Sequence, residues 1–175
     1  ITYPSCDTKE SAVSLHRVQG VYSKGKGRNN PIEAKAVVNE ITRRLLDPVL
    51  QEKSIGVVTL NTDQQRTIED QLDVARRKYP QIETFFNSTD SYDGVFIKNL
   101  ESVQGDERDV IILSLGYGPT EPGGNTMSMN FGPLNKSGGE RRLNVAITRA
   151  TTEILVFASF DSSMIDLSRS SALAV

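Results

Sequence analysis

Three short, largely apolar segments constrain the fold of this chain more than any other feature. They span residues 55–59 (IGVVT), 110–115 (VIILSL) and 153–158 (EILVFA), and turn-forming residues lie near each of them. β-Branched and aliphatic runs of this length are typical of buried strands. Because the runs are nearly continuous instead of alternating with polar residues, they favour parallel strands that are covered on both faces.

Two amphipathic helices are expected between these strands. The stripe of the first helix consists of Ala34, Val37, Val38, Ile41 and Leu45. The stripe of the second consists of Ile68, Leu72, Ala75 and Tyr79. Asn30 suits the N-cap of the first helix, Pro31 suits its first turn, and Glu33 occupies the position of a capping-box acid. Thr62 and Gln65 form a capping-box pattern at the start of the second helix.

Weaker strand patterns occur at residues 13–18, 82–86 and 94–97. We expect the first of them to lie at an edge of the sheet or to run antiparallel. Strands that alternate with helices indicate an α/β layered sheet. The length of 175 residues suits one domain with a single substantial core, so we assign residues 1–175 to one domain.

The composition excludes several classes of function. Twenty basic and 22 acidic residues give a formal net charge of −2, so contacts with nucleic acid would have to come from local clusters. Cys6 is the single cysteine, which excludes an internal disulfide, and with the lone His16 it leaves too few ligands for an ordinary transition-metal site. The sequence has no signal pattern and no apolar run of about 18 residues, so we expect a cytoplasmic protein without a membrane segment.

The segment 20–27, GVYSKGKG, matches the phosphate-binding pattern G-x-x-x-x-G-K-[ST] at all but its last position. A true phosphate-binding loop ends in a hydroxyl residue that binds Mg²⁺ and leads directly into a helix. Here Gly27 replaces the hydroxyl residue, and the expected helix begins only after Asn30. We therefore interpret the segment as a solvated turn and expect the domain to lack a Walker A motif of its own. The cations of this turn are Lys24, Lys26 and Arg28.

Residues 116–139 (GYGPTEPGGNTMSMNFGPLNKSGG) are rich in Gly, Pro, Asn and Ser. A segment of this length without secondary structure is longer than an ordinary connection inside a compact domain. We expect an insertion at 116–139 that is either a functional loop or a mobile one.

A helix with three arginines is expected at residues 138–150 (GGERRLNVAITRA), directly before the third buried strand. Its buried stripe would consist of Leu143, Ala146, Ile147 and Ala150. Arg142 and Arg149 are seven residues apart and would share one side of this helix, with Arg141 nearby. Salt bridges to Glu140 and Glu153 are one explanation for the arginines. The other is that their fork-shaped, always charged guanidinium groups bind a phosphate chain.

Residues 101–109 (ESVQGDERD) lead directly into the second buried strand. Gly105 would let the backbone approach a ligand closely, and the acids could accept hydrogen bonds from sugar hydroxyls. A solvated turn would have the same composition. A paired-carboxylate hydrolase site at Asp106, Glu107 and Asp109 gains no support from a nearby histidine or from metal-ligand spacing.

In the order IGVVTLNTDQQ, ESVQGDERDVIILS and GGERRLNVAITRA, these segments resemble motifs IV, V and VI of superfamily 1 helicases. The resemblance is strongest to the branch that contains the nonsense-mediated-decay RNA helicase and its bacterial relatives, and it spans about residues 32–159. RRLNVAITRA is its most specific part, followed by V-Q-G-x-E-x-D at 103–109. It implies an α/β, RecA-like fold of the P-loop NTPase type, with a mainly parallel sheet and helices on both faces. The domain would be the second of two motor domains, with ATP in the cleft between them and single-stranded DNA or RNA running across both.

The same resemblance implies a nucleotide-binding group of residues. Arg149 matches the arginine finger that reaches the γ-phosphate of ATP, where it stabilises the charge of the transition state. Glu107 matches an acid associated with the ribose, Gly105 matches the turn beside the phosphates, and Arg142 matches a supporting nucleotide or interdomain contact. ATP and Mg²⁺ would be held mainly by the first motor domain.

Five residues match family positions near the nucleic-acid backbone: Thr59, Asn61 and Gln64 in motif IV, and Ser102 and Val103 in motif V. The chain departs from the family in two places. It has Leu60 and Asn61 where relatives often have Pro-Tyr, and it has no Y-R-M-H-P-type segment with a second phosphate-directed arginine. The second departure suggests a fragment of a longer protein that begins just after that segment.

Two hypotheses about function remain open at this point. In the first, the chain is the C-terminal motor domain of an ATP-dependent DNA or RNA helicase or translocase, and its partner is the N-terminal RecA-like domain of the same polypeptide. Alone it would not hydrolyse ATP, because it lacks the phosphate-binding lysine and the catalytic acid. In the second, it is a RecA-like module that binds nucleotide, nucleic acid or a protein without a motor cycle. We expect a monomer.

Overall fold

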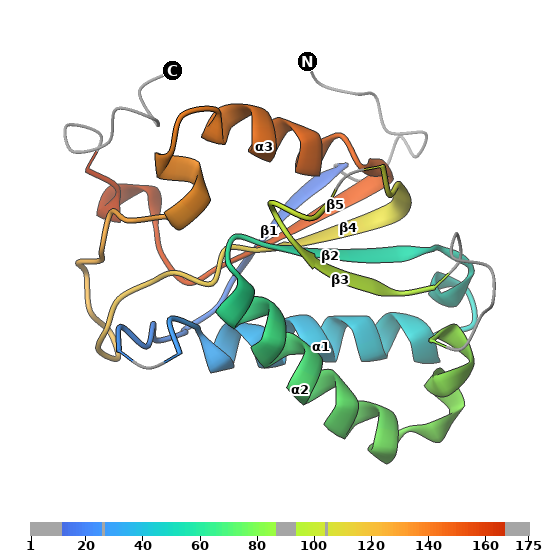
Figure 1. Ribbon diagram of the computed structural model, residues 1–175. Helices are drawn as coiled ribbons and strands as arrows, with labels where there is room; N and C mark the ends of the chain where they lie inside the picture. The colour runs from blue at the N-terminus through green and yellow to red at the C-terminus, as the bar shows by residue number, and fades with distance from the viewer. Residues whose placement is uncertain (1–11, 26, 87–93, 104, 167–175) are drawn as a thin grey trace.

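The computed structural model describes residues 12–25, 27–86, 94–103 and 105–166. Within them, one five-stranded sheet has the order β1-β5-β4-β2-β3, and all neighbouring strands are parallel. The strands are β1 (Val13–Arg17), β2 (Ile55–Thr59), β3 (Phe96–Asn99), β4 (Arg108–Ser114) and β5 (Ala150–Ala158). Helices α1 (Pro31–Leu46) and α2 (Thr62–Lys78) cover one face, and α3 (Gly139–Ile147) lies over the other (Figure 1). The expected α/β, RecA-like class is confirmed.

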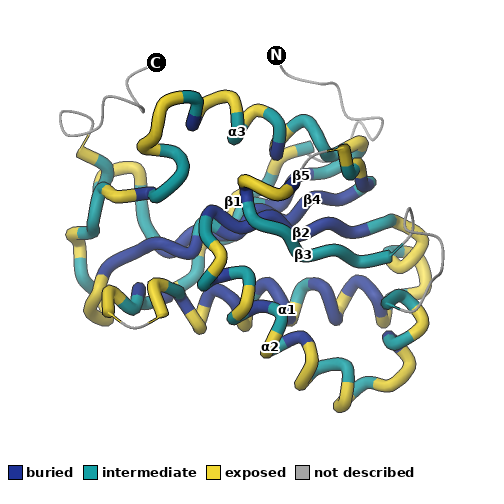
Figure 2. The backbone as a smooth tube through the Cα atoms, in the orientation of Figure 1, coloured by how far each residue is buried: buried dark blue, intermediate teal, exposed yellow. Residues whose placement is uncertain are grey.

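The central strands are buried on both sides, as the dark blue segments in the middle of Figure 2 show. Val57 and Ile112 are paired in register and pack toward α1 and α2. Their neighbours Val58 and Ile111 belong to a second apolar cluster, on the side of α3 and of the loop after β4. Successive residues of a strand point to opposite faces, so a strand that lies between two cores needs apolar residues on both of its faces.

The start of α1 agrees with the sequence in one respect and differs in another. The side chain of Asn30 accepts a hydrogen bond from the backbone N–H of Glu33 at 3.1 Å, so Asn30 is the N-cap. Glu33 does not complete a capping box, because its carboxylate is buried against the strand ends. In α2 the N-cap is Asn61, which accepts from the N–H of Gln64 at 2.8 Å, and the expected capping box that begins at Thr62 is wrong by one residue.

The weaker strand predictions have mixed outcomes. Residues 13–17 form β1 at an edge, and it runs parallel, so the antiparallel alternative is wrong. β3 covers 96–99, slightly later than expected. Residues 82–86 do not form a strand. Pro80 begins a 3₁₀ helix there (Pro80–Phe85), which places Ile82 in the core under α1 and α2. The other 3₁₀ helices of the described residues are Leu50–Glu52, Gly132–Asn135 and Ser162–Met164.

A buried polar network joins the carboxyl ends of β4 and β5 to α1. One carboxylate oxygen of Glu33 accepts hydrogen bonds from the hydroxyl of Ser114 (2.8 Å) and the N–H of Gly116 (2.7 Å). The other oxygen accepts from the hydroxyl of Ser159 at 2.7 Å. Desolvation by burial raises the pKa of Glu33 to about 7, although these hydrogen bonds act in the opposite direction.

Glu33 is expected to make the protein less stable as the pH rises from about 4.5 to about 7. Over this interval the unfolded chain has released the proton while the folded chain still holds it, so the free energy of unfolding falls with pH. The loss is on the order of 3 kcal/mol. Glu33→Gln keeps the shape of the side chain without titrating, so its stability should fall less across the interval. Urea unfolding at both ends of the interval measures this, and an equal fall in both proteins would refute the assignment.

The loop at 116–139 packs against the core on the α3 side. Phe131 is buried, and its ring centroid lies 5.3 Å from that of Tyr117 and 5.9 Å from that of Phe160. The side chain of Asn135 accepts from the N–H of Phe131 (2.6 Å) and donates to the carbonyl of Met129 (3.0 Å). The loop is therefore held in a defined position beside the carboxyl ends of the strands (Figure 1).

Candidate functional site

The predicted site residues lie in two groups. One group is at the amino ends of the parallel strands, which we call the amino edge, and the other is at their carboxyl ends, the carboxyl edge. Glu107 and Arg149 directly precede β4 and β5, so they lie at the amino ends of these strands. Asn61 directly follows the last residues of β2, and Ser102 follows β3, so both lie beyond the carboxyl ends. Glu107 and Arg149, which are expected to bind nucleotide, thus lie on the other side of the domain from Asn61 and Ser102, which are expected to bind nucleic acid.

At the amino edge, Arg149 and Glu107 come together from separate segments. The Nε of Arg149 donates to the carbonyl of Val145 at 3.1 Å, and its Nη1 lies 3.6 Å from Oε1 of Glu107. The backbone N–H of Arg108 donates to the carbonyl of Arg149 at 3.0 Å, which fixes the two strand starts side by side. The Glu107 side chain is 62% exposed and that of Arg149 21% exposed, so this ion pair contributes little to stability. Another anion could replace Glu107 as the partner of Arg149.

The three arginines of this region have different environments. The helix ends at Ile147, so Arg149 lies beyond it and shares no helix face with Arg142, contrary to expectation. Arg142 donates from Nη1 to the carbonyls of Pro133 (3.5 Å) and Ser137 (3.2 Å), which ties the helix to the loop before it. Arg141 is almost fully exposed and only 4.0 Å from Glu140.

The other details of the helix prediction are partly wrong. Ala146 is buried as expected, but Ile147, the last residue of the helix, is exposed. Ala150 is the first residue of β5. Glu153, which we considered as a partner for these arginines, instead binds Arg44 of α1 at 2.9 Å. Arg149 therefore has Glu107, and not Glu153, as its acidic neighbour.

Two acids of the motif V segment, Asp106 and Asp109, contact residues outside the predicted nucleotide site. Gly105 has φ +81°, a conformation that favours glycine, and open space lies where a side chain would be. Asp106 forms an ion pair with Lys98. Burial tends to raise the pKa of Asp109, but hydrogen bonds from the Ser54 backbone and hydroxyl and from Thr151 lower it below its usual value. These contacts leave no pair of free carboxylates for a hydrolase site. Gln104 lies outside the described residues.

At the carboxyl edge, the predicted nucleic-acid residues differ in accessibility. Thr59, Gln64 and Val103 are fully buried. The Thr59 hydroxyl donates to the carbonyl of Asn61 at 2.9 Å, and the Gln64 amide donates to the hydroxyl of Ser114 at 3.1 Å. Their side chains shape the edge from beneath, whereas Ser102 is exposed and Asn61 is partly exposed.

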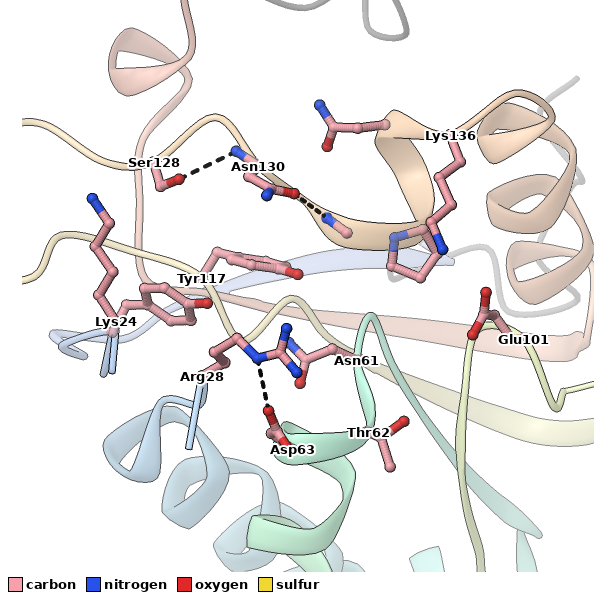
Figure 3. A pocket seen from close by; sticks show the side chains of 14 residues that line it. Lys24, Arg28, Asn61, Thr62, Asp63, Glu101, Tyr117, Ser128, Asn130 and Lys136 are labelled. Carbon is pink, nitrogen blue, oxygen red and sulfur yellow. Dashed lines mark hydrogen bonds and ion pairs between the residues drawn. The ribbon is translucent and has the colours of Figure 1, made fainter. Parts of the chain in front are cut away.

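A cleft of about 650 Å³ lies at this edge (Figure 3). Its walls come from the loop after β1, the start of α2, the turn after β3 and the loop at 116–139. The charged residues that line it are Lys24, Arg28, Asp63, Glu101 and Lys136. Asn61 is the one predicted site residue among the lining side chains. Sequence reasoning recognised the cations at 24 and 28 only as a solvated turn, because nothing in the sequence shows that four distant segments converge. Lys26 lies outside the described residues.

No helix within the described residues is long and apolar enough to cross a membrane. In the same part of the chain, no group of three or more His, Cys, Asp or Glu side chains could hold a metal ion.

Two curated proteins are similar in sequence to this chain. One is an uncharacterised ATP-dependent helicase of Mycoplasma pneumoniae, 40% identical over 136 residues, and the other is its counterpart in Mycoplasma genitalium, 41% identical over 136 residues. Each match covers 75% of this chain and 11% of the relative, so the chain spans only a small part of these proteins.

Comparison with solved structures finds the C-terminal domain of a possible DNA helicase from Lactobacillus plantarum. The TM-score is 0.46 and the identity 14%, over 87% of this chain and 76% of the other. A family model described as an AAA domain matches residues 4–161. Together with the curated helicases, this match bears out the resemblance to superfamily 1 helicase domains. The chain belongs to the AAA domain family AAA_12.

Proposed function

We propose that this chain acts as the second motor domain of an ATP-dependent superfamily 1 helicase or translocase. The observation that carries the proposal is the pairing of Arg149 with Glu107 at the amino edge, 3.6 Å apart and both reachable from solvent. The names of the two curated relatives support the same activity. The partner would be an N-terminal RecA-like domain of the same polypeptide, in a monomeric cytoplasmic protein that uses ATP and Mg²⁺.

In this proposal Arg149 acts on the γ-phosphate of ATP bound against the first motor domain. The hydrogen bond from its Nε to Val145 orients the guanidinium, with Nη1 on the side of Glu107. A pre-oriented guanidinium is well suited to stabilise charge that develops during phosphoryl transfer. Glu107 would hold Arg149 in place before the domains close, and would then accept hydrogen bonds from the ribose.

Gly105 and Arg142 have supporting roles in the proposal. The positive φ of Gly105 turns the backbone beside the phosphates and leaves open space for a ligand. Arg142 fixes the start of α3 through the carbonyls of Pro133 and Ser137, and so positions the segment that carries Arg149.

At the carboxyl edge, single-stranded DNA or RNA would pass over Asn61 and Ser102. Thr59 and Gln64 would position this surface through their buried hydrogen bonds, and Val103 through its packing in the core. Strands β2 and β4 run between the two edges and are almost entirely buried. Because a packed sheet moves as one body, it would transmit domain closure at the nucleotide to the nucleic-acid edge.

ATP hydrolysis by the isolated chain and by a longer protein that carries it tests this proposal. In this proposal the chain supplies the arginine finger and the first motor domain supplies the phosphate-binding lysine loop, so we expect turnover only by the longer protein. Steady turnover by a clean preparation of the 175-residue chain, abolished by Arg149→Ala, would overturn the division of labour between two domains. Absence of turnover from the longer protein would favour a binding module without a motor cycle.

A further inference from the structure

The cleft at the carboxyl edge has two cations that no carboxylate neutralises. Arg28 is engaged, because its Nε donates to Asp63 at 3.1 Å. Among the described residues, no carboxylate lies within 4.0 Å of the Lys24 or Lys136 ammonium group. Figure 3 shows these lysines at opposite ends of the cleft, one on the loop after β1 and the other on the loop at 116–139. The cleft thus has a positive group at each end.

Between the lysines, the cleft presents neutral hydrogen-bonding groups. The polar neutral side chains of its lining are Tyr22, Asn61, Thr62, Tyr117, Ser128, Asn130 and Asn135. Desolvation by burial raises the pKa of Tyr117 and of Tyr22, so both hydroxyls keep their protons at neutral pH and can donate. The Nδ2 of Asn61 is buried and has no hydrogen-bond partner of good geometry among the described residues. Arg28 is paired with Asp63, which leaves Lys24 and Lys136 against the single carboxylate of Glu101 in the lining, so the cleft has a net positive charge and suits an anionic ligand.

The aromatic rings beneath the cleft indicate which part of a nucleic acid would bind. Tyr22 is 8% exposed and Tyr117 4% exposed, and their ring centroids are 5.2 Å apart. Tyr117 also packs against Phe131, so the ring faces are covered by one another and by the core. Stacking of a base requires an open aromatic face. The cleft therefore favours the sugar-phosphate backbone over the bases.

We propose that this cleft binds the sugar-phosphate backbone of a single strand, with Lys24 and Lys136 contacting its phosphates. The loop at 116–139 provides one wall of the cleft. It converts the surface at the carboxyl ends of the β-strands into a channel for the nucleic acid. The inference rests on the proposed function, which places nucleic acid at this edge, and it adds residues outside motifs IV, V and VI. Backbone recognition of this kind is independent of sequence.

The test is fluorescence anisotropy of a labelled single-stranded oligonucleotide of mixed sequence, as DNA and as RNA, with the 175-residue chain. The variant is Lys24→Gln with Lys136→Gln. The matched control is Lys35→Gln with Lys78→Gln, which removes the same charge from exposed lysines on α1 and α2. All four side chains are exposed, so both variants should fold as the native chain does, which circular dichroism checks.

We expect the cleft variant to bind roughly tenfold or more weakly at low salt, and the control to bind like the native chain. The slope of log affinity against log salt should become shallower by about 1.4, because each lost phosphate contact on a single strand accounts for about 0.7. Equal losses in both variants, or none in the cleft variant, would overturn the proposal. Displacement of the oligonucleotide by equimolar ATP or triphosphate would also overturn it and would assign the cleft to a free phosphate chain.

The two proposals fail in different ways. If the lysine variant loses binding but a longer protein shows no ATP turnover, the cleft assignment holds and the motor function falls. If ATP turnover depends on Arg149 but oligonucleotide binding does not change when Lys24 and Lys136 are substituted, the motor function holds. The nucleic acid then binds elsewhere on the domain.

Discussion

Arg149→Ala is expected to lower ATP turnover of a longer protein that carries this chain by ~10³-fold or more. The substitution removes the guanidinium that would stabilise charge on the transferring phosphoryl group. ATP affinity should change much less, because most binding contacts would come from the first motor domain. Steady-state turnover and the affinity for a fluorescent ATP analogue, measured on the same preparations, separate the two effects.

Arg141→Ala is the matched control for this prediction. Arg141 has the same charge and lies on the same segment, but its side chain is 89% exposed and points to solvent near Glu140. Its removal should leave turnover nearly unchanged. A similar loss in both variants would indicate a general effect of positive charge on the segment 139–149, and a loss in neither would make the Arg149–Glu107 pair a purely structural contact.

Phe131→Ala is expected to destabilise the chain by about 3–5 kcal/mol, the range for deletion of a buried aromatic ring. Phe131 anchors the loop at 116–139 through its contacts with Tyr117 and Phe160. Its loss should also release the wall that carries Lys136, so oligonucleotide binding should weaken even where the variant remains folded. Urea unfolding and anisotropy measure the two consequences.

Val49→Ala serves as the control for stability, because Val49 is an apolar residue that is largely exposed. Surface changes of this kind usually alter the free energy of unfolding by less than about 0.5 kcal/mol. If Phe131→Ala unfolds at the same urea concentration as the native chain, the loop does not pack as described. If it is destabilised but binds oligonucleotide normally, the loop contributes to folding and not to the channel.

The sequence predicted the architecture well because the sheet has a core on each face. β2 begins and ends at the predicted residues, and β4 and β5 contain or overlap the predicted apolar runs. The predictions that failed concern segments in which two local structures compete. Residues 82–86 have the composition of a strand, but Pro80 and the burial of Ile82 favour a 3₁₀ helix. Asn61 caps α2 in place of Thr62 because its side chain reaches the N–H of Gln64.

The site was only partly predictable, for a related reason. Motif resemblance named Glu107 and Arg149, and the structure brings these two together. It could not distinguish the partly exposed Asn61 from the buried Thr59 and Gln64, since burial depends on tertiary packing. Sequence reasoning also gave no role to Lys136, which becomes part of a cleft only when the loop folds back over the strand ends.

The role of the buried Glu33 could not be predicted from the sequence either, because it too depends on tertiary contacts. Glu33 lies three residues after the N-cap Asn30, the position from which a capping-box acid acts, so the local pattern predicts a capping role. Instead, the hydroxyls of Ser114 and Ser159 at the ends of β4 and β5 donate hydrogen bonds to its buried carboxylate. A local signal was overridden by partners about 80 and 126 positions away along the chain.

The most direct test of the central claim is ATP turnover by a longer protein that carries this chain, measured with and without single-stranded DNA or RNA. A motor domain that binds nucleotide at one edge and nucleic acid at the other predicts turnover that the single strand stimulates and that Arg149→Ala removes. Turnover that is absent, or that responds to neither the strand nor Arg149, would contradict the account and leave a binding module in its place.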